Sequence, residues 1–386
     1  MRPAEGPGPP QASCTVDLDA IRENVAALRS RAGAAEVMAV VKADGYGHGL
    51  VPAAGAALDG GARSLGVSVL AEAFALRAAG VTVPVFAWLA APGADFRRAI
   101  AENVDVAAYS VDQLAEISAA AAASGAPAAV HLKVDTGMWR GGATRDGWPG
   151  LVAAAHRAER DGLVEVAGVW SHLACADEPG HPGTARQLAA FAEAVEVARR
   201  AGLRPRQCHI ANSAATLTLP ESRFDLVRPG LAIYGLNPLD PDHDVPGLRL
   251  RPAMTLAARV AQTKRAPAGV GVSYGHRYTT TRPTTLAVVP LGYADGVPRA
   301  ASERGRVLLS GRTYPVAGRV CMDQFMIDVN DAAVARGDAV VLYGPGDRGE
   351  PTALDWAHAA GTIAYEIVTR VGPRVPRIYL GERTRG

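Results

Sequence analysis

Residues 36–47 read EVMAVVKADGYG, a short apolar run that ends at Lys42 and passes into a glycine-containing turn. A run this short, with no polar face, is typical of a parallel strand that is buried on both sides. A doubly wound open sheet usually follows its first strand with the phosphate turn G-x-G-x-x-G, which residues 42–47 do not match. The stretch therefore favours a closed α/β barrel over the doubly wound alternative.

Further apolar runs follow before residue 230, most of them succeeded by a helix-like or Gly/Ala-rich stretch. They span residues 64–69, 83–88, 104–108, 128–135, 164–172, 207–211 and 224–228. Helix signals lie between them: Ser110-x-x-Gln113 is a capping-box pattern, and the helix formers that start at Glu72 stop at Gly80. Alternating strands and helices indicate βα units, and eight such units predict a TIM (β/α)8 barrel.

After about residue 245 the pattern changes to strands in which Val and Thr alternate with polar residues, separated by Gly and Pro turns. One helix is predicted near the end, starting at Thr352-x-x-Asp355 and stopping at Gly372-Pro373. We therefore predict three parts. They are a disordered Pro- and Gly-rich tail at 1–12, an α/β barrel at 13–245 and a mostly β domain at 246–386.

The composition of the 386-residue chain argues against several classes of function. Lys and Arg number 40 against 38 Asp and Glu, and this balance leaves no basic stripe, so neither nucleic acid nor a membrane surface is an expected partner. No run reaches the ~18 apolar residues of a membrane span, and the start does not read as a signal peptide. The four cysteines stand far apart, which argues against disulfides and a metal site and favours a reducing cytoplasm.

Polar side chains follow several predicted strands, at the rim where the chemistry of TIM barrels gathers. Lys42 ends the first strand, and an amine desolvated there would have a lowered pKa and become nucleophilic. Asn212, Ser213 and the backbone of Gly230 follow the last two strands and can donate to a phosphate monoester. A nucleophilic lysine that faces a phosphate site indicates pyridoxal 5'-phosphate. The other polar residues at this rim are Lys133, Asp135, Arg140, His172, His209 and Arg228.

These residues also have simpler interpretations when each is taken alone. A strand-end lysine such as Lys42 can reach solvent, and Asn-Ser after a strand is more often a turn or a helix cap. His172 can be a core histidine, and Tyr274 a packed aromatic in a loop. The density of cationic and imidazole groups at one rim favours a functional site over these alternatives.

Several segments of the chain resemble the alanine racemase family, in the same order and over nearly all of the chain after residue 14. They are VVKADGYGHG (40–49), HLKVDTGM (131–138), HIANSAATL (209–217), VRPGLAIYGL (227–236), VSYGHRY (272–278), LGYADG (291–296), GRVCMDQFMIDV (318–329) and YEIVTRVGPRVPRIY (365–379). The first segment is also similar to other barrel-type pyridoxal-phosphate proteins. The whole set, with its members in the β domain, is specific to the racemase family.

By this resemblance, Lys42 binds pyridoxal 5'-phosphate covalently and acts as the base on one face of the substrate α-carbon. Tyr274 is similar to the base on the opposite face, which in the family comes from the partner subunit, so the resemblance implies a homodimer with shared sites. One base removes the α-proton and the other returns it from the far side, which inverts the centre. His172 matches the histidine bonded to this tyrosine, and Arg228, supported by His209, matches the arginine that faces the pyridine nitrogen.

The remaining implied contacts divide between cofactor and substrate. The further predicted cofactor contacts are Tyr46, Asn212, Ser213, Gly230, Leu231 and Tyr365. Arg140 and the backbone of Met322, which comes from the partner chain, match the groups that hold the substrate carboxylate. Lys133 matches a lysine that the family often carries as a carbamate, whose negative charge would orient Arg140. Asp323 is expected to support the partner side of the site.

This chain departs from the usual family pattern at Trp139, where a small residue is common, and at Ala364, where a polar residue is common. A tryptophan beside Arg140 is expected to alter the packing of the loop that carries the arginine. The loss of a polar side chain before Tyr365 is expected to remove one local hydrogen bond.

The resemblance implies an isomerase that interconverts L- and D-alanine and supplies D-alanine for cell-wall peptidoglycan. A barrel-type amino-acid decarboxylase is one alternative, but such enzymes tend to place an acid where this chain has Arg228. A non-catalytic pyridoxal-phosphate carrier is another, but those proteins resemble a lone barrel. A racemase for serine or a basic amino acid is a third, which the crowding by Tyr274 and Tyr365 disfavours.

Overall fold

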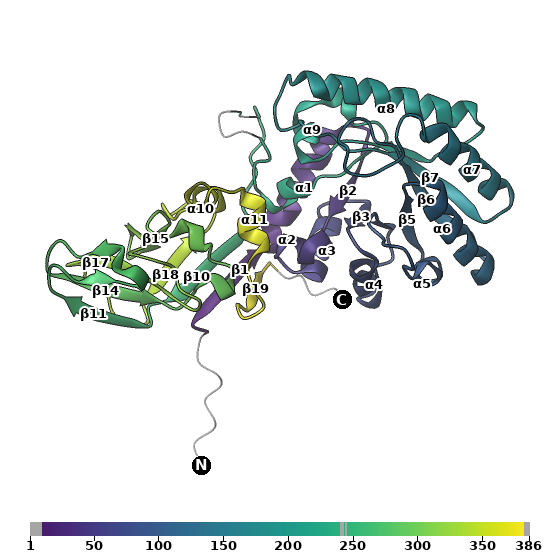
Figure 1. Ribbon diagram of the computed structural model, residues 1–386. Coiled ribbons are helices and arrows are strands. Elements are labelled where there is room, and N and C mark those ends of the chain that lie inside the picture. The colour runs from purple at the N-terminus through teal and green to yellow at the C-terminus, as the bar shows by residue number, and fades with distance from the viewer. Residues whose placement is uncertain (1–9, 240–242, 244, 382–386) are drawn as a thin grey trace, which may run out of the picture. The chain divides into compact units, whose positions relative to one another are not determined.

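The computed structural model describes residues 10–239, 243 and 245–381. Contacts within the chain divide it into two compact units (Figure 1). Of the described residues, those within 20–45 and 50–251 form the barrel unit, and residues 10–19, 46–49 and 252–381 form the β unit. Within the described ranges, no helix is both long enough and apolar enough to span a bilayer.

Parallel strands form the barrel unit's sheet in the order β8-β7-β6-β5-β4-β3-β2-β9. They are β2 (Glu36–Val40), β3 (Ser64–Val67), β4 (Val85–Ala87), β5 (Val104–Ala108), β6 (Ala128–Lys133), β7 (Val164–Trp170), β8 (Gln207–His209) and β9 (Leu226–Val227). Backbone hydrogen bonds join the two ends of this order, from Asp225 N–H to Cys208 O (3.1 Å) and from Arg228 N–H to Ala211 O (3.0 Å). The predicted α/β barrel is confirmed, because each apolar run forms one strand.

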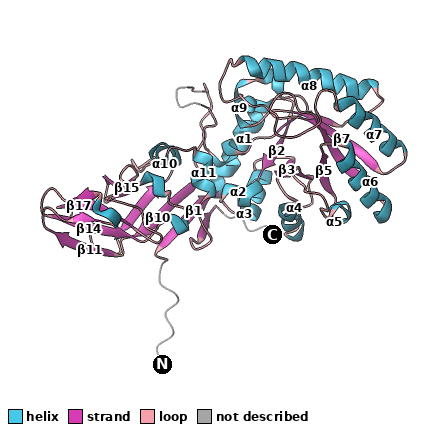
Figure 2. Cartoon of the chain, in the orientation of Figure 1, coloured by secondary structure: helices cyan, strands magenta, loops and turns pink. Residues whose placement is uncertain are grey.

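Helices connect these strands, and Figure 2 shows α6, α7 and α8 on the outer side of the sheet. The helices are α1 (Leu18–Ala32), α3 (Leu50–Asp59), α4 (Leu70–Ala78), α5 (Phe96–Ala101), α6 (Val111–Ser124), α7 (Trp148–Arg160), α8 (Pro182–Arg200) and α9 (Ser213–Thr218), with 3-10 turns η1 (Pro220–Ser222) and η2 (Leu231–Tyr234). The predicted start of α6 is confirmed, since the Ser110 hydroxyl accepts from Gln113 N–H at 3.2 Å. Its end is set by Gly125, which takes the left-handed φ of 67° that favours glycine.

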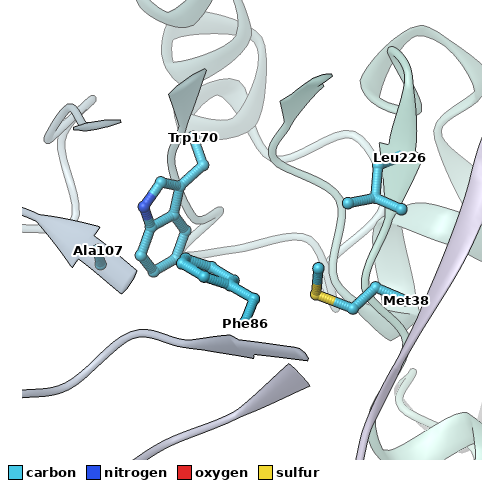
Figure 3. Packing of buried hydrophobic residues seen from close by; sticks show 5 residues of the cluster. All are labelled: Met38, Phe86, Ala107, Trp170 and Leu226. Carbon is cyan, nitrogen blue, oxygen red and sulfur yellow. The ribbon is translucent and has the colours of Figure 1, made fainter. Parts of the chain in front are cut away.

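The interior of the barrel is filled by one buried residue from each of five strands (Figure 3). These residues are Met38, Phe86, Ala107, Trp170 and Leu226. The rings of Phe86 and Trp170 meet edge to face, with centroids 5.3 Å apart. The interior of the barrel is therefore a packed core rather than a pore. Polar side chains in this interior must pack against the Phe86 and Trp170 rings.

The β unit contains three sheets, ordered β16-β15-β18-β10-β1-β19, β11-β14-β17 and β12-β13. Its strands are β1 (Ala12–Asp17), β10 (Met254–Arg259), β11 (Gln262–Ala266), β12 (Gly271–Val272), β13 (Tyr278–Thr279), β14 (Thr284–Val289), β15 (Arg306–Leu309), β16 (Arg312–Pro315), β17 (Phe325–Asn330), β18 (Ala339–Tyr343) and β19 (Arg377–Leu380). Short 3-10 turns complete it: η3 (Tyr274–His276), η4 (Tyr293–Asp295) and η5 (Arg299–Ala301). The predicted mostly β second domain is confirmed.

The boundaries differ from the predicted ones at the start of the chain. Strand β1 pairs antiparallel with β10 and parallel with β19, so residues 12–19 belong to the β unit and not to the predicted barrel. Alternate burial along β1 suits a strand with one covered face. Residues 1–9 of the predicted tail lie outside the described residues, and Ala12, predicted to be in the tail, begins β1.

The predicted helix near the end of the chain is two helices, α10 (Ala353–Ala360) and α11 (Ala364–Thr369). Its start was predicted correctly, because Thr352 and Asp355 bond reciprocally as a capping box. Gly361 interrupts it with a left-handed φ of 70°, eleven positions before the stop predicted at Gly372.

Candidate active site

Lys42 lies directly after β2, in the turn α2 (Lys42–Tyr46). Residues 43–46 of this turn all adopt left-handed angles, with φ between 53° and 61°. Such a run is unfavourable unless neighbouring groups hold it. The Glu72 carboxylate of α4 accepts from Ala43 N–H at 2.6 Å and from Ser68 N–H at 2.9 Å. Glu72, which the sequence analysis did not assign to the site, thus holds the Lys42 turn in place.

The Lys42 amine is half-buried, and its Nζ lies 5.7 Å from the ring centroid of Trp88. Burial lowers the pKa of Lys42, the positive charge of Arg140 lowers it further, and Glu72 opposes both. A lysine with a lowered pKa carries more of the neutral, nucleophilic amine near neutral pH. The structure thus gives Lys42 a half-buried amine with a lowered pKa, and its role as the reactive lysine stays a prediction.

The Lys133 amine is enclosed by aromatic rings inside the barrel. Its Nζ lies 4.4 Å from the ring centroid of Trp170 and 4.9 Å from that of Tyr109. Burial, followed by the positive charges of Arg140 and Arg228, lowers the pKa of Lys133 to about 8. A large fraction of this amine is neutral from pH 8 upward, which makes it reactive toward a small electrophile.

The Arg228 guanidinium is buried, and both of its terminal nitrogens make hydrogen bonds. Nη2 donates to Ser171 O at 2.8 Å, and Nη1 donates to His209 Nδ1 at 2.7 Å. His172 Nδ1 lies 3.4 Å from Nη2. Burial and the nearby Arg228 charge lower the pKa of both histidines well below the ordinary value, so both rings are neutral. Burial and Arg140 lower the pKa of Arg228 to about 9, which leaves it charged at neutral pH.

The loop that carries Arg140 is organised by Asp135. Its Oδ1 accepts the N–H groups of Gly137 (2.8 Å), Met138 (3.0 Å) and Trp139 (3.2 Å). Trp139 is 82% exposed and has a left-handed φ of 55°, a conformation that explains why a small residue is favourable here. Arg140 follows it and is exposed.

Asn212 acts as the N-cap of α9. Its Oδ1 accepts from Ala215 N–H at 3.0 Å, which is the helix-cap role given above as the simpler interpretation. The side-chain oxygen of Asn212 is therefore engaged in holding the start of α9.

Ser213 and Gly230 meet at the carboxyl ends of β8 and β9. The buried Ser213 hydroxyl accepts from Gly230 N–H at 2.8 Å and from Ala232 N–H at 3.3 Å, on either side of Leu231. A hydroxyl has two acceptor positions and one hydrogen, so both acceptor positions are filled. The hydrogen of Ser213 is left to donate to an anion at this rim.

Tyr46 and Tyr365 belong to the β unit, where their ring centroids are 6.0 Å apart. Burial raises the pKa of Tyr46, so its hydroxyl stays protonated and remains a donor. Gly47 makes this arrangement possible, because a Cβ there would lie 2.4 Å from Val368 O of α11.

Tyr274 lies in the turn η3 of the β unit and is 69% exposed. Ser273 before it has a left-handed φ of 61°, and its hydroxyl donates to Arg319 O at 2.7 Å. Gly318 allows the close approach, since a Cβ there would lie 2.7 Å from Val272 O. A structured turn thus presents a tyrosine to the outside of the single chain.

Met322 lies beside this turn and is 53% exposed. The carbonyls of Cys321 and Met322 accept from Tyr293 N–H and Ala294 N–H, both at 3.0 Å. A Cβ at Gly292 would lie 2.2 Å from Met322 O, so only glycine permits this contact. Residues 273–276 and 321–324 line a shallow cavity of about 430 Å³.

Asp323 is held by an ion pair with Arg374, from Nη1 to Oδ1 at 2.8 Å. The same arginine bonds the buried Asp295 at 3.0 Å. Arg374 thus connects Asp323, next to Met322, with Asp295, and support of the partner side of the site by Asp323 stays a prediction.

The structure places Lys133, His209 and Arg228 around Trp170, with His172 beside Arg228. Lys42 lies near Trp88, and Ser213 and Gly230 bond each other. Tyr274 and Met322 line one cavity in the β unit. Sequence reasoning missed three aromatic members, Trp88, Tyr109 and Trp170, which look like core residues at strand ends. It also gave no role to His131. The available signal was spacing, because His131 and Lys133 are two residues apart on β6 and so face the same side.

The barrel carries two lysines with lowered pKa values and a buried arginine at one rim. Together with the β unit, these features indicate a barrel-type enzyme. The family described as "Alanine racemase, N-terminal domain" matches residues 16–238, and "Alanine racemase, C-terminal domain" matches residues 253–379. The chain belongs to the alanine racemase family, whose members are isomerases.

Individual relatives agree with this assignment over nearly the full length. The alanine racemase of Salinispora arenicola is 61% identical over 97% of this chain and 99% of its own. The solved alanine racemase of Streptomyces lavendulae is 52% identical, with a TM-score of 0.96 over 98% of this chain and 99% of that chain. A Bacillus anthracis alanine racemase solved with bound L-Ala-P is 35% identical, with a TM-score of 0.89 over 99% of this chain and 97% of that chain.

Proposed function

We propose that this chain interconverts L- and D-alanine, with pyridoxal 5'-phosphate as cofactor and in a homodimer whose subunits share their sites. Family membership supports the reaction class, and the residues of the barrel rim support the cofactor. The observation that carries the proposal is the buried Arg228, whose two nitrogens bond a backbone carbonyl and a neutral histidine.

The donor set of the rim fits the cofactor. The Lys42 amine, with its lowered pKa, suits covalent attachment to an aldehyde, and the free hydrogen of Ser213 suits a phosphate oxygen. Asn212, Gly230, Leu231, Tyr46 and Tyr365 stay predicted phosphate-side contacts. When bound, the cofactor supplies an electron-withdrawing ring that makes the α-hydrogen of the amino acid acidic.

Arg228 determines which reaction is favoured. A carboxylate facing the ring nitrogen would keep that nitrogen protonated, whereas a guanidinium has only donors and cannot accept the proton. Weaker electron withdrawal limits charge build-up on the ring and with it side reactions such as transamination. This chemistry supports proton removal and return over decarboxylation.

Two bases on opposite faces complete the mechanism. In one direction the neutral Lys42 Nζ would take the α-proton while the protonated Oη of the partner chain's copy of Tyr274 gives a proton on the opposite face. In the reverse direction the deprotonated Oη would take the proton and the Lys42 ammonium would give one. His172 is neutral by burial and its Nδ1 faces the donor Nη2 of Arg228, so its proton is on Nε2 and is suited to donate a hydrogen bond to the oxygen of that tyrosine. Arg140 and the N–H of the partner chain's copy of Met322 hold the substrate carboxylate between the two bases.

Lys133 is proposed to be carbamylated. Its neutral amine is the form that attacks carbon dioxide, and the anionic product relieves its repulsion from Arg140. The product would then orient Arg140 by a charge-assisted hydrogen bond.

Exchange in deuterated water tests the reaction. L-Alanine incubated with the purified chain and pyridoxal phosphate is expected to give D-alanine that carries deuterium at the α-carbon, measured by chiral chromatography and mass spectrometry. Lys42→Ala should abolish this product, while Lys264→Ala, an exposed lysine on β11, should leave it unchanged. Exchange of serine, lysine or arginine in place of alanine would redirect the proposal to another amino acid.

Mixed dimers test the shared site. Lys42→Ala and Tyr274→Phe chains are each expected to be inactive alone. If Tyr274 serves the partner's Lys42, random mixing restores about a quarter of wild-type activity, because half of the dimers then hold one intact site out of two. Activity that stays at the level of the separate variants would show that the two bases come from one chain.

The biological role proposed for this activity is the supply of D-alanine for peptidoglycan in the cytoplasm. The location rests on the cysteines, since Cys14 and Cys208 are free and buried, as in proteins of reducing compartments.

A further inference from the structure

A chain of hydrogen bonds crosses the interior of the barrel. Arg228 Nη1 lies 2.7 Å from His209 Nδ1, and His209 Nε2 lies 2.9 Å from His131 Nδ1. His131 Nε2 then lies 3.3 Å from Asp105 Oδ2. We refer to these residues, Arg228, His209, His131 and Asp105, as the relay.

The relay runs from one end of the barrel to the other. Asp105 is the second residue of β5, near its amino end, and lines a cavity of about 480 Å³ together with Arg63 and Arg77. His209 ends β8, and Arg228 follows β9, at the carboxyl rim. The relay therefore links a carboxylate at one mouth of the barrel to the arginine at the other.

Hydrogen-bond chemistry fixes the direction of every bond in the relay. Arg228 can only donate, so His209 Nδ1 must accept and the His209 proton must be on Nε2. That proton is donated to His131 Nδ1, which places the His131 proton on Nε2, facing the Asp105 carboxylate. An arginine at one end and a carboxylate at the other thus select one tautomer for both rings.

The surrounding core keeps the two rings in place. Both histidines are fully buried, and His131 stacks on Phe86 with ring centroids 4.3 Å apart. The His209 ring stacks on the Trp170 ring with centroids 5.9 Å apart. Figure 3 shows Phe86 and Trp170, the two rings on which the histidines stack. The absence of a side chain at Gly168 of β7 gives the His131 ring its space, because a Cβ there would lie 2.2 Å from His131 Nδ1.

We infer that Asp105 and His131 are positioning residues for Arg228. Asp105 orients His131, His131 fixes the tautomer of His209, and His209 then holds one nitrogen of the guanidinium in a set direction. Without the carboxylate, His131 can turn or change tautomer, and His209 can present an N–H where Arg228 needs an acceptor. That Arg228 faces the ring nitrogen of the cofactor rests on the proposed function, but the hydrogen bonds of the relay do not depend on it.

Histidine tautomers in the cofactor-free chain test the relay directly. With 15N-labelled histidine, NMR of the wild-type chain is expected to show His131 and His209 as neutral rings protonated on Nε2. Single His→Gln substitutions assign the two rings among the nine histidines. A His209 ring protonated on Nδ1 would overturn the inference.

Variants of Asp105 test its role in positioning. Asp105→Leu removes the acceptor and is expected to disturb the His209 signals and shift the absorbance maximum of the bound cofactor. Asp105→Asn keeps an acceptor oxygen and should restore both. Glu36→Gln, which changes an exposed carboxylate that lines the same cavity, should alter neither. A folded Asp105→Leu chain with wild-type His209 signals would refute the inference.

Kinetics separate positioning from simple structural support. Asp105→Leu is expected to lower kcat by about tenfold or more with KM for the amino acid nearly unchanged, because Arg228 is displaced and the carboxylate-binding groups are not. If the tautomers agree but no amino acid is racemised, the relay stands and the proposed function fails. An equal loss of kcat in Asp105→Asn and Asp105→Leu would refute positioning through the hydrogen bond.

Discussion

Lys42, Lys133 and Arg228 each have a pKa lowered mainly by burial, with Arg140 as the next cause. Each positive charge at this rim destabilises the charged form of the others. Loss of a proton or binding of an anion therefore stabilises the cluster. A phosphate, a substrate carboxylate and a carbamate are all anions. The excess of positive charge is thus a physical reason for this rim to take the ligands proposed for it.

Carbamylation of Lys133 should depend on pH in a set direction. Because its pKa is about 8, the reactive neutral amine increases as pH rises through 8. At a fixed partial pressure of labelled carbon dioxide, a 13C carbonyl signal is expected to be stronger at pH 8.5 than at pH 6.5. Lys133→Arg should remove this signal. A signal of equal strength at both pH values would contradict a pKa of about 8 for Lys133.

Trp139 should be replaceable with a gain in stability. Its left-handed φ disfavours every residue with a Cβ, so Trp139→Gly is expected to exceed Trp139→Ala in unfolding free energy by about 1 kcal/mol. Denaturant unfolding of the two variants measures the difference. Equal stabilities would mean that the loop relaxes to an ordinary conformation when the indole is removed.

Among the elements, the turns of the β unit depend on glycines that permit close backbone contacts. Gly292 lets the chain after β14 pack on the carbonyl of Met322, and Gly318 lets the next turn approach Val272. Two exposed residues, Tyr274 and Met322, are therefore carried by rigid turns. Preorganised turns lower the ordering cost when a partner covers them.

Gly292→Ala should destabilise the β unit, because its Cβ would lie 2.2 Å from Met322 O. A loss of about 1–3 kcal/mol is expected, as for other overpacked sites. Gly150→Ala in α7, where nothing lies within 4 Å, is the matched control and should be neutral or slightly stabilising. Thermal unfolding compares the two, and similar effects would argue against the contact at Met322.

Sequence patterns predicted the strands of the barrel well, because buried parallel strands are continuous apolar runs bounded by polar turns. They misplaced β1, since the partners of ASCTVD lie more than two hundred residues away and no local signal names them. They also joined α10 and α11, because Gly361 was not read as a stop. At the site, the sequence analysis named residues at strand ends and in the quoted motifs, and their roles stay predictions. Glu72 contacts the Lys42 turn and Asp105 contacts His131 from other elements, and spacing alone does not reveal such contacts.

At the scale of the whole molecule, the β unit is built from both ends of the described chain. Strand β1 lies between β10 and β19 in the six-stranded sheet, so it is an interior strand and not an edge. Removing an interior strand exposes two unpaired edges. The unit that carries Tyr274 and Met322 therefore depends on residues 12–17.

A chain that begins at Leu18 should fail to form the β unit, while a chain that begins at Pro10 keeps β1 whole and should fold. Hydrogen exchange of the amides in β10 and β19 measures this difference. We expect protection in the longer chain and fast exchange in the shorter one. Equal protection would mean that the sheet closes without β1.

The pairing of β1 with β10 and β19 also sets an order of events on the ribosome. β1 is synthesised first, but neither of its partners exists until residues 20–251 have been made, a delay of roughly 10 to 50 seconds at ordinary translation rates. The barrel sequence can fold during that interval while the first strand waits unpaired. β19 is synthesised later than β10, so the six-stranded sheet can be completed only after residues 377–380 have left the ribosome.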